Sequence, residues 1–278
     1  MPDTNIWNTW TITPLSDYRA TLGESPVWDA AEQCIWWVDI DGKTLCRTDA
    51  ATGTTRTWDA PERIGFIAPS RTGLIVGLER GLFHFDAPTG YFILFYGLSE
   101  RGLRFNDATV ENSGTIWAGT MDLDNVRPVG TLYRITPDLE VSPVMTGFTT
   151  INGLAVDEDL GRLYLSDSHP SVQKIWTMPN TPEINQRRLF CDMTAMHGRP
   201  DGGTVAPDGT YWIAGVDGGY LHGFRPDGTH VHQLVTPMYD PTKLIFSCED
   251  TTTGWLTSKT DGDTGKGGWL CKVKLNDN

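Results

Sequence analysis

The feature that most constrains this chain is a unit that recurs six times along its 278 residues. Each unit has a short apolar run, a turn and a second apolar run that is often aromatic, which is the pattern of a β-hairpin. The paired runs are 24–28 with 34–38, 65–68 with 74–78, 108–110 with 115–118, 152–156 with 162–165, 201–205 with 211–214, and 244–247 with 254–257. A third run follows at 45–47, 82–85, 131–135, 173–176 and 220–224. Six units of three or four short strands predict an all-β, six-bladed β-propeller.

The last unit ends with residues 269–275 and has no outer strand of its own. We expect residues 7–13 to supply that strand, because this closes the ring and removes exposed sheet edges. A two-sheet sandwich or two small β-domains is the alternative, but neither would maintain similar spacing within every unit. With no low-complexity segment or composition break, residues 1–278 are expected to form a single domain.

Charge and composition exclude several classes of partner. The formal net charge is −13 and the pI is near 4.8, whereas nucleic-acid binding needs clustered Lys and Arg. The longest apolar stretch, near 91–98, is far shorter than the ~20 residues of a membrane helix. The N-terminus lacks signal-peptide features, and five cysteines without Cys-x-x-Cys spacing suggest no disulfide framework. We expect a cytoplasmic protein with no nucleic-acid or membrane partner.

Polar residues stand where buried strands should begin. The third unit opens with Arg104-Phe105-Asn106-Asp107, and unpaired polar side chains are costly in a core. Four units carry an oxygen-bearing side chain 11 or 12 residues before the aromatic residue of the second run: Glu24, Asn106, Asn152 and Asp201. The innermost strands of a propeller face a central channel, so these four side chains should meet at one level around its axis.

Two carboxylates and two amides are hard oxygen donors that suit a divalent ion such as Ca²⁺, Mn²⁺, Mg²⁺ or Zn²⁺. Each residue taken alone is also an ordinary turn residue, because Asn-Gly and Asp-Gly pairs are common in turns. The shared register of all four favours a central metal site.

Several motifs, in this order, resemble the SMP-30/gluconolactonase/regucalcin family over nearly the whole chain. They are Gly23-Glu24-Ser25-Pro26-x-Trp28, Arg104-Phe105-Asn106-Asp107, Gly119-Thr120-Met121, Asn152-Gly153 and Pro200-Asp201-Gly202. The resemblance implies a six-bladed propeller that holds one divalent ion (Ca, Mn, Zn, Fe or Mg) and hydrolyses sugar lactones. It assigns Glu24, Asn152 and Asp201 as metal ligands, and Arg104 and Asn106 as substrate contacts, with Asn106 near or on the metal.

Two assignments keep alternatives. An acidic residue shortly after Gly119-Thr120-Met121 helps to hold the sugar in such proteins, and Asp124 is the nearest match, with Asp122 as the alternative. Asp201 is the preferred group to accept a proton from the attacking water. Metal binding lowers the pKa of a carboxylate, so metal-bound hydroxide is the competing base.

The resemblance, together with these residues, implies a metal-dependent hydrolase that opens an aldonolactone in pentose or hexose oxidation, the ion polarising the carbonyl and positioning water. Hydrolysis of other esters or organophosphates is one alternative, and a non-catalytic calcium-binding or scaffolding propeller is another. Arg104 and Asn106 favour catalysis over ion binding alone, because an ion-binding protein needs Glu24, Asn152 and Asp201 but has no use for Arg104 and Asn106 in the same cavity. The alternative role for Arg104 is a surface salt bridge.

Overall fold

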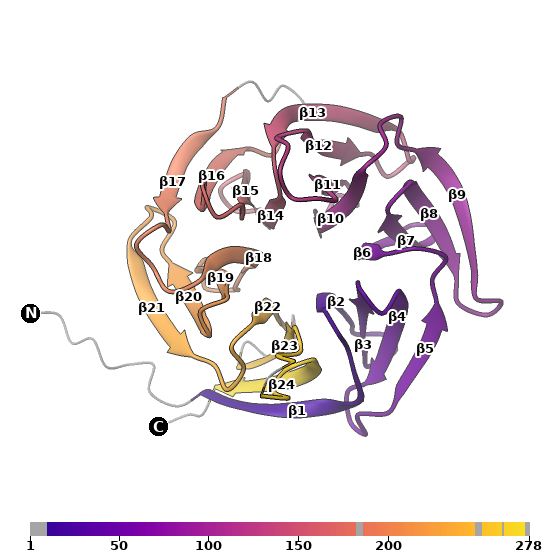
Figure 1. The fold of residues 1–278 in the computed structure, drawn as a ribbon, viewed down its shortest axis with the longest axis horizontal. Helices are drawn as coiled ribbons and strands as arrows, with labels where there is room; N and C mark the ends of the chain where they lie inside the picture. Colours follow the sequence, from indigo (N-terminus) through magenta and orange to yellow (C-terminus); the bar gives the residue numbers. More distant parts are fainter. Residues whose placement is uncertain (1–9, 182–185, 248–251, 263, 276–278) are drawn as a thin grey trace, which may run out of the picture.

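The computed structural model describes residues 10–181, 186–247, 252–262 and 264–275. Within these ranges, 24 strands form six four-stranded antiparallel sheets. The sheets are arranged as blades around a central axis, and one edge strand of each sheet lies nearest to it (Figure 1). The predicted six-bladed β-propeller is confirmed.

The first blade comprises β2 (Gly23–Asp29), β3 (Cys34–Asp39), β4 (Thr44–Asp49) and β5 (Thr55–Asp59). The second blade comprises β6 (Ile64–Ser70), β7 (Gly73–Leu78), β8 (Gly81–Asp86) and β9 (Tyr91–Gly97). The third blade comprises β10 (Leu103–Val110), β11 (Ile116–Asp122), β12 (Gly130–Ile135) and β13 (Val141–Phe148). The fourth blade comprises β14 (Ile151–Asp157), β15 (Arg162–Asp167), β16 (Lys174–Pro179) and β17 (Arg188–Asp192). The fifth blade comprises β18 (Arg199–Val205), β19 (Tyr211–Val216), β20 (Tyr220–Phe224) and β21 (His230–Val235). The sixth blade comprises β22 (Pro241–Phe246), β23 (Thr253–Ser258), β24 (Trp269–Leu275) and β1 (Trp10–Arg19).

The ring is closed by β1, which pairs antiparallel with β24 as the outer strand of the last blade. Trp10 lies opposite Leu275, and Pro14 lies opposite Cys271. Of the predicted closing strand 7–13, residues 7–9 lie outside the described residues, residues 10–13 are confirmed, and the strand continues to Arg19. The chain then enters β2 of the first blade, so the two ends of the ring are joined by backbone hydrogen bonds (Figure 1).

The core lies between neighbouring blades. Aromatic rings meet across these interfaces: Tyr164 of β15 stacks on Tyr211 of β19 with centroids 4.2 Å apart, and Trp36 of β3 meets Phe85 of β8 edge-on. A strand packed on both faces is buried along its whole length, as β3 and β11 are, and reads as a continuous apolar run. This packing fixes the inner strands, which carry the candidate site. The described residues include no helix long and apolar enough to cross a membrane.

Candidate active site in the central channel

All six inner strands carry an irregularity of strand register near their N-terminal ends. A bulge of this kind frees residues from the ladder and re-aims their side chains. Glu24 and Asn152 are the last paired residues before the irregularity in β2 and β14, and Asn106 and Asp201 lie within it in β10 and β18. The four predicted oxygen donors therefore occupy equivalent places in four blades.

The other two blades contribute no acid or amide at this level. The irregularity holds Gly65 in β6 and Thr242 in β22. A Cβ on Gly65 would lie 2.0 Å from the carbonyl oxygen of Phe105 on β10. The close approach of β10 therefore requires a glycine at position 65 of β6. Thr242 donates its hydroxyl to the carbonyl of Gly23 at 2.6 Å. These two blades shape the channel, while four blades supply its donors.

Three of the four donors form a continuous chain of hydrogen bonds. The side-chain amide of Asn106 donates to Oδ1 of Asn152 at 3.1 Å and to the carbonyl of Ile151 at 2.8 Å. The amide of Asn152 donates to Oδ1 of Asp201 at 2.6 Å and to Oγ of Ser168 at 3.0 Å. All three residues are buried. Side chains from three successive blades thus meet in one buried cluster.

Glu24 joins this cluster through its charge rather than through a direct hydrogen bond. Its carboxylate accepts the backbone N–H of Ser25 at 2.6 Å, and Ser25 has a φ of +50°, in the left-handed region. Gly153, which follows Asn152, also has a positive φ of +64°. The same local turn therefore follows two of the predicted ligands, and backbone of this kind is often retained at functional sites.

The surroundings of Glu24 and Asp201 disfavour the ionised form of both carboxyl groups. Burial raises the pKa of Glu24 to about 7, and the nearby charge of Asp107 adds to the shift. Burial also raises the pKa of Asp201 well above its usual range, with the charge of Glu24 as the next cause. A cation bound between these two buried carboxylates would stabilise their ionised forms.

The chemistry of the donors fits a hard divalent ion. Among the described residues, no group of three or more His, Cys, Asp or Glu side chains is placed to hold a metal. The candidate set has two carboxylates, and amide oxygens from Asn152 and Asn106 would complete it. All are oxygen donors, which Ca²⁺, Mg²⁺ and Mn²⁺ prefer.

Arg104 lies beside this cluster and is only 8% exposed. Its Nη1 donates to the carbonyl of Phe105 at 3.0 Å, and within the described ranges no carboxylate lies within ion-pair distance of it. Burial lowers its pKa to about 10, although the charges of Glu24 and Asp201 act in the opposite direction. The alternative of a surface salt bridge is wrong. A guanidinium has five N–H donors, so most remain available to a ligand.

The acidic residues after β11 have different environments. Asp124 is exposed in the turn that follows the strand, and no hydrogen bond between described residues links it to the cluster. Asp122 is buried, and it accepts hydrogen bonds from the guanidinium of Arg127 at 2.7 and 3.0 Å and from the backbone of Val126 and Arg127. The carboxylate of Asp122 therefore stabilises its own loop, whereas the exposed carboxylate of Asp124 is the one accessible to a ligand.

A buried ion pair next to the candidate donors was not predicted from the sequence. Nζ of Lys243, on β22, lies 2.6 Å from Oδ1 of Asp107, on β10. Both side chains are almost fully buried. The available signal was a lysine at the head of the otherwise apolar run that begins at Leu244, together with the acid at the end of Arg104-Phe105-Asn106-Asp107.

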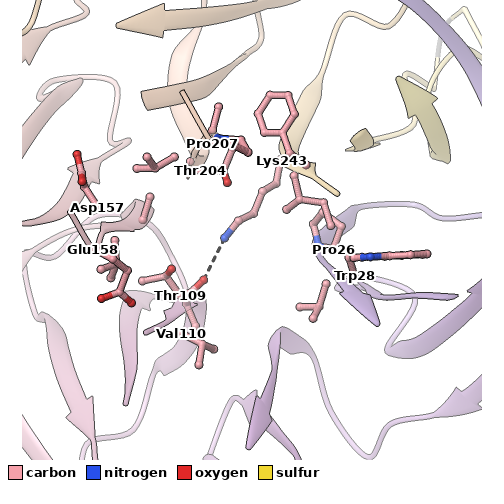
Figure 2. Close-up of a pocket in the computed structure, with 18 of the residues that line it drawn as sticks. Pro26, Trp28, Thr109, Val110, Asp157, Glu158, Thr204, Pro207 and Lys243 are labelled. Atoms are coloured by element: carbon pink, nitrogen blue, oxygen red, sulfur yellow. Dashed lines mark hydrogen bonds between the residues drawn. The ribbon is translucent and has the colours of Figure 1, made fainter. Parts of the chain in front are cut away.

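A cavity of about 650 Å³ occupies the opposite end of the channel. Its walls come from the C-terminal halves of the inner strands and the loops after them, and include Trp28, Val110, Asp157 and Glu158. Figure 2 shows the side chain of Lys243 reaching across this space from β22 towards β10. None of the predicted site residues lines this cavity, whereas Lys243 does, and its Nζ bonds to Asp107, the residue after Asn106.

Comparisons with known proteins agree with the fold and the motifs. Residues 22–260 match the family model of the SMP-30/gluconolactonase/LRE-like region. A 6-deoxy-6-sulfogluconolactonase of Pseudomonas putida is 32% identical over 243 residues, covering 86% of this chain and 84% of the relative. An L-arabinolactonase of Azospirillum brasilense is 31% identical over 237 residues, covering 82% and 78%.

Among solved structures, a calcium-binding protein, regucalcin, from Agrobacterium tumefaciens superposes with a TM-score of 0.87, at 24% identity and with 96% of each chain covered. At this identity the likeness establishes the fold. The family-model match over residues 22–260 and the 32% identity over 86% of the chain establish more: the chain belongs to the SMP-30/gluconolactonase/LRE-like family.

Proposed function

We propose that this protein hydrolyses a sugar lactone to the corresponding aldonic acid and that it needs one divalent metal ion to do so. The observation that carries the proposal is the arrangement of Glu24, Asn106, Asn152 and Asp201 around one end of the channel, with buried Arg104 beside them. The names of the relatives support the reaction class, since two are lactonases for sugar acids. The enzyme would be a hydrolase acting on a cyclic carboxylic ester.

Glu24, Asn152 and Asp201 would hold the ion, with Asn106 next to it. When bound, the ion supplies a Lewis acid that polarises the lactone carbonyl and favours ionisation of a water. The ion also removes the cost of two buried carboxylates, because it stabilises the charged form of each.

Asp201 is our preferred acceptor for the proton of the attacking water. Its Oδ1 is fixed by the amide of Asn152 at 2.6 Å, which leaves the second carboxylate oxygen for another partner. The carboxyl group of Asp201 would hold this proton after the water has attacked. Asp201 can then return the proton to the ring oxygen as the acyl–oxygen bond breaks.

Arg104 and Asn106 would orient the substrate. The guanidinium of Arg104 has free donors in a buried setting, where hydrogen bonds to carbonyl or hydroxyl oxygens are strong. Asn106 already uses its amide on Asn152 and Ile151, so its carbonyl oxygen remains for a sugar hydroxyl or the ion. Asp124 would reach the sugar from its exposed turn at the end of β11.

The substrate class follows from the relatives and the polarity of the site. The two relatives act on a sulfonated six-carbon and a five-carbon sugar lactone by their names, so pentono- and hexonolactones are the first candidates. A non-catalytic calcium-binding propeller would need the oxygen donors alone. The buried cation of Arg104 opposes ion binding and favours a role with substrate, which supports the enzyme.

The deciding experiment measures acid release with a pH indicator. Protein treated with EDTA is assayed on a panel of pentono- and hexonolactones, and Ca²⁺, Mn²⁺, Fe²⁺, Zn²⁺ or Mg²⁺ is restored one at a time. We expect ring opening above the spontaneous rate only when an ion is present. Ring opening at the spontaneous rate with every ion would remove the proposal.

We place the protein in the cytoplasm. Cys34, Cys46, Cys191 and Cys271 are free thiols, as expected for a reducing compartment, and Cys248 lies outside the described residues. Fractionation of the source cells with detection of the intact chain would test this location.

A further inference from the structure

Lys243 is a charged residue in an unusual place, because it is the third residue of the inner strand β22 and is only 5% exposed. Its Nζ donates to Oδ1 of Asp107 at 2.6 Å and to the carbonyl of Ala108 at 3.0 Å. The lysine belongs to β22 and both acceptors belong to β10, three blades away around the ring. Its side chain therefore spans the channel, as Figure 2 shows for the bond to Ala108.

The stem of Lys243 packs against the residue that follows Asp201. A Cβ on Gly202 would lie 2.5 Å from Cβ, 2.6 Å from Cγ and 2.8 Å from Cδ of Lys243. The absence of a side chain at Gly202 is thus what admits the lysine stem. In turn, the stem limits where β18 can move at the residue next to a candidate ligand.

The head of Lys243 acts on the other two strands through Asp107. Oδ1 of Asp107 also accepts the N–H of Ala108 at 2.8 Å, and Oδ2 accepts the N–H of Leu154 on β14 at 2.8 Å. Asp107 directly follows Asn106, and Leu154 lies two residues after Asn152. The ion pair therefore fastens β10 to β14 at the level where Asn106 and Asn152 meet.

We infer that Lys243 is a positioning residue for the candidate active site. Its ammonium holds the carboxylate of Asp107 in place between β10 and β14, and its stem supports β18, so that Asn106, Asn152 and Asp201 keep their hydrogen-bonded arrangement. The residue lies below the donors and lines the opposite cavity, so it acts through its neighbours and not on the substrate. Partners of this kind commonly set the affinity and activity of a metal site.

The location distinguishes this role from general stabilisation. A stabilising ion pair could lie at any blade interface, yet this pair touches the strands that carry three of the four donors. A buried ion pair often contributes little net stability compared with apolar residues, so the geometry that this pair imposes explains its presence better than stabilisation does.

The test is the substitution Lys243→Met, which keeps a stem of similar length on Gly202 and removes the ammonium. The matched control is Lys174→Met, because Lys174 forms a 3.7 Å ion pair with Asp192 between β16 and β17, away from the channel. Ion affinity of the metal-free proteins is measured by titration calorimetry, kcat and KM are measured on the best lactone, and the crystal structure of the variant is determined.

We expect Lys243→Met to weaken ion affinity and to lower kcat by about 10- to 100-fold, with a smaller effect on KM, while Lys174→Met matches the wild type. In the crystal structure, the Asn106–Asn152–Asp201 hydrogen bonds should be broken or displaced. If Lys243→Met does not fold, Lys243→Met/Asp107→Asn removes both charges and leaves no uncompensated carboxylate, and the same losses are expected.

A folded variant that keeps wild-type ion affinity and all three side chains in place would overturn the inference. The kinetic readout rests on the proposed lactonase activity, but the other two do not. If the wild type opened no lactone while the variant lost ion affinity, the proposed function would fail and the positioning role would stand. If the wild type bound no ion, the crystal structure of the variant would decide.

Discussion

The side-chain amide of Asn152 donates a 2.6 Å hydrogen bond to Oδ1 of Asp201, which joins the innermost strands of two neighbouring blades inside the channel. The two residues are 49 positions apart in the chain. Their contact exists because both lie at the register irregularity of their strands, where the chain turns side chains out of the ladder and towards the axis.

Replacing Asp201 with Ala should abolish both ion binding and lactone hydrolysis, because it removes a predicted ligand and the preferred proton acceptor together. Calorimetry should show no ion binding, and the rate should fall to the spontaneous value. Asp227→Ala is the control, since Asp227 lies in an exposed turn between β20 and β21 of the same blade. Full activity in Asp201→Ala would remove this residue from the site.

Replacing Arg104 with Ala should separate catalysis from ion binding. Loss of a donor aimed at the substrate should lower kcat/KM by about 100-fold or more. Ion affinity should stay the same or rise, because a positive charge is removed from beside Glu24 and Asp201. Arg104→Lys keeps the charge but loses the planar fork, so partial activity is expected. Equal activity in all three proteins would argue for a propeller that binds ions without catalysis.

The metal-free protein should become less stable as the pH rises from about 4.5 to 7. The pKa of Glu24 is raised from 4.5 to about 7, so in this window the folded state binds more protons than the unfolded state, and the free energy of unfolding falls with pH. A shift of this size corresponds to about 3 kcal/mol at most.

Thermal unfolding in EDTA across pH 4 to 8 measures this effect. Glu24→Gln should flatten the profile, because the titrating group is gone. A divalent ion should stabilise the wild type most at the higher pH, since it binds the ionised carboxylates and releases protons. A metal-free profile that rose with pH through this window would contradict the assignment.

Gly65→Ala should destabilise the ring and disturb Asn106. The added Cβ would meet the carbonyl oxygen of Phe105 at 2.0 Å and Cα of Asn106 at 3.0 Å, so β10 must shift. Overpacking of this kind costs about 1–3 kcal/mol. Gly262→Ala is the matched control, because no heavy atom of the described residues, apart from the chain neighbours of Gly262, lies within 4 Å of the new Cβ. Chemical denaturation and ion affinity measure both effects, and equal behaviour of the two variants would refute the tight contact.

The two acids after β11 should behave differently when each is replaced by Ala. Asp122→Ala removes the partner of four hydrogen bonds and should cost about 1–3 kcal/mol of stability. Asp124→Ala should leave stability unchanged and raise KM, if Asp124 holds the sugar as predicted. Denaturation and steady-state kinetics of the two variants provide the test, and an unchanged KM in Asp124→Ala would remove that residue from the substrate site.

The sequence by itself determined the fold and the level of the candidate site along the channel. Six hairpin-like units identified the propeller, because a strand packed on both faces between blades must read as a short apolar run bounded by turns. Counting from the aromatic residue of each unit then located Glu24, Asn106, Asn152 and Asp201, since the repeat places equivalent residues at equivalent heights.

Only the tertiary structure decided how these residues are connected. The register irregularities, the Asn106–Asn152–Asp201 hydrogen bonds and the burial of Arg104 depend on contacts between blades that are tens of residues apart in the chain. Lys243 and Asp107 are separated by 136 positions and meet across the channel. A repeat pattern fixes height along the axis, but it cannot say which side chains reach across it, because that depends on side-chain length and on where a glycine such as Gly202 leaves room.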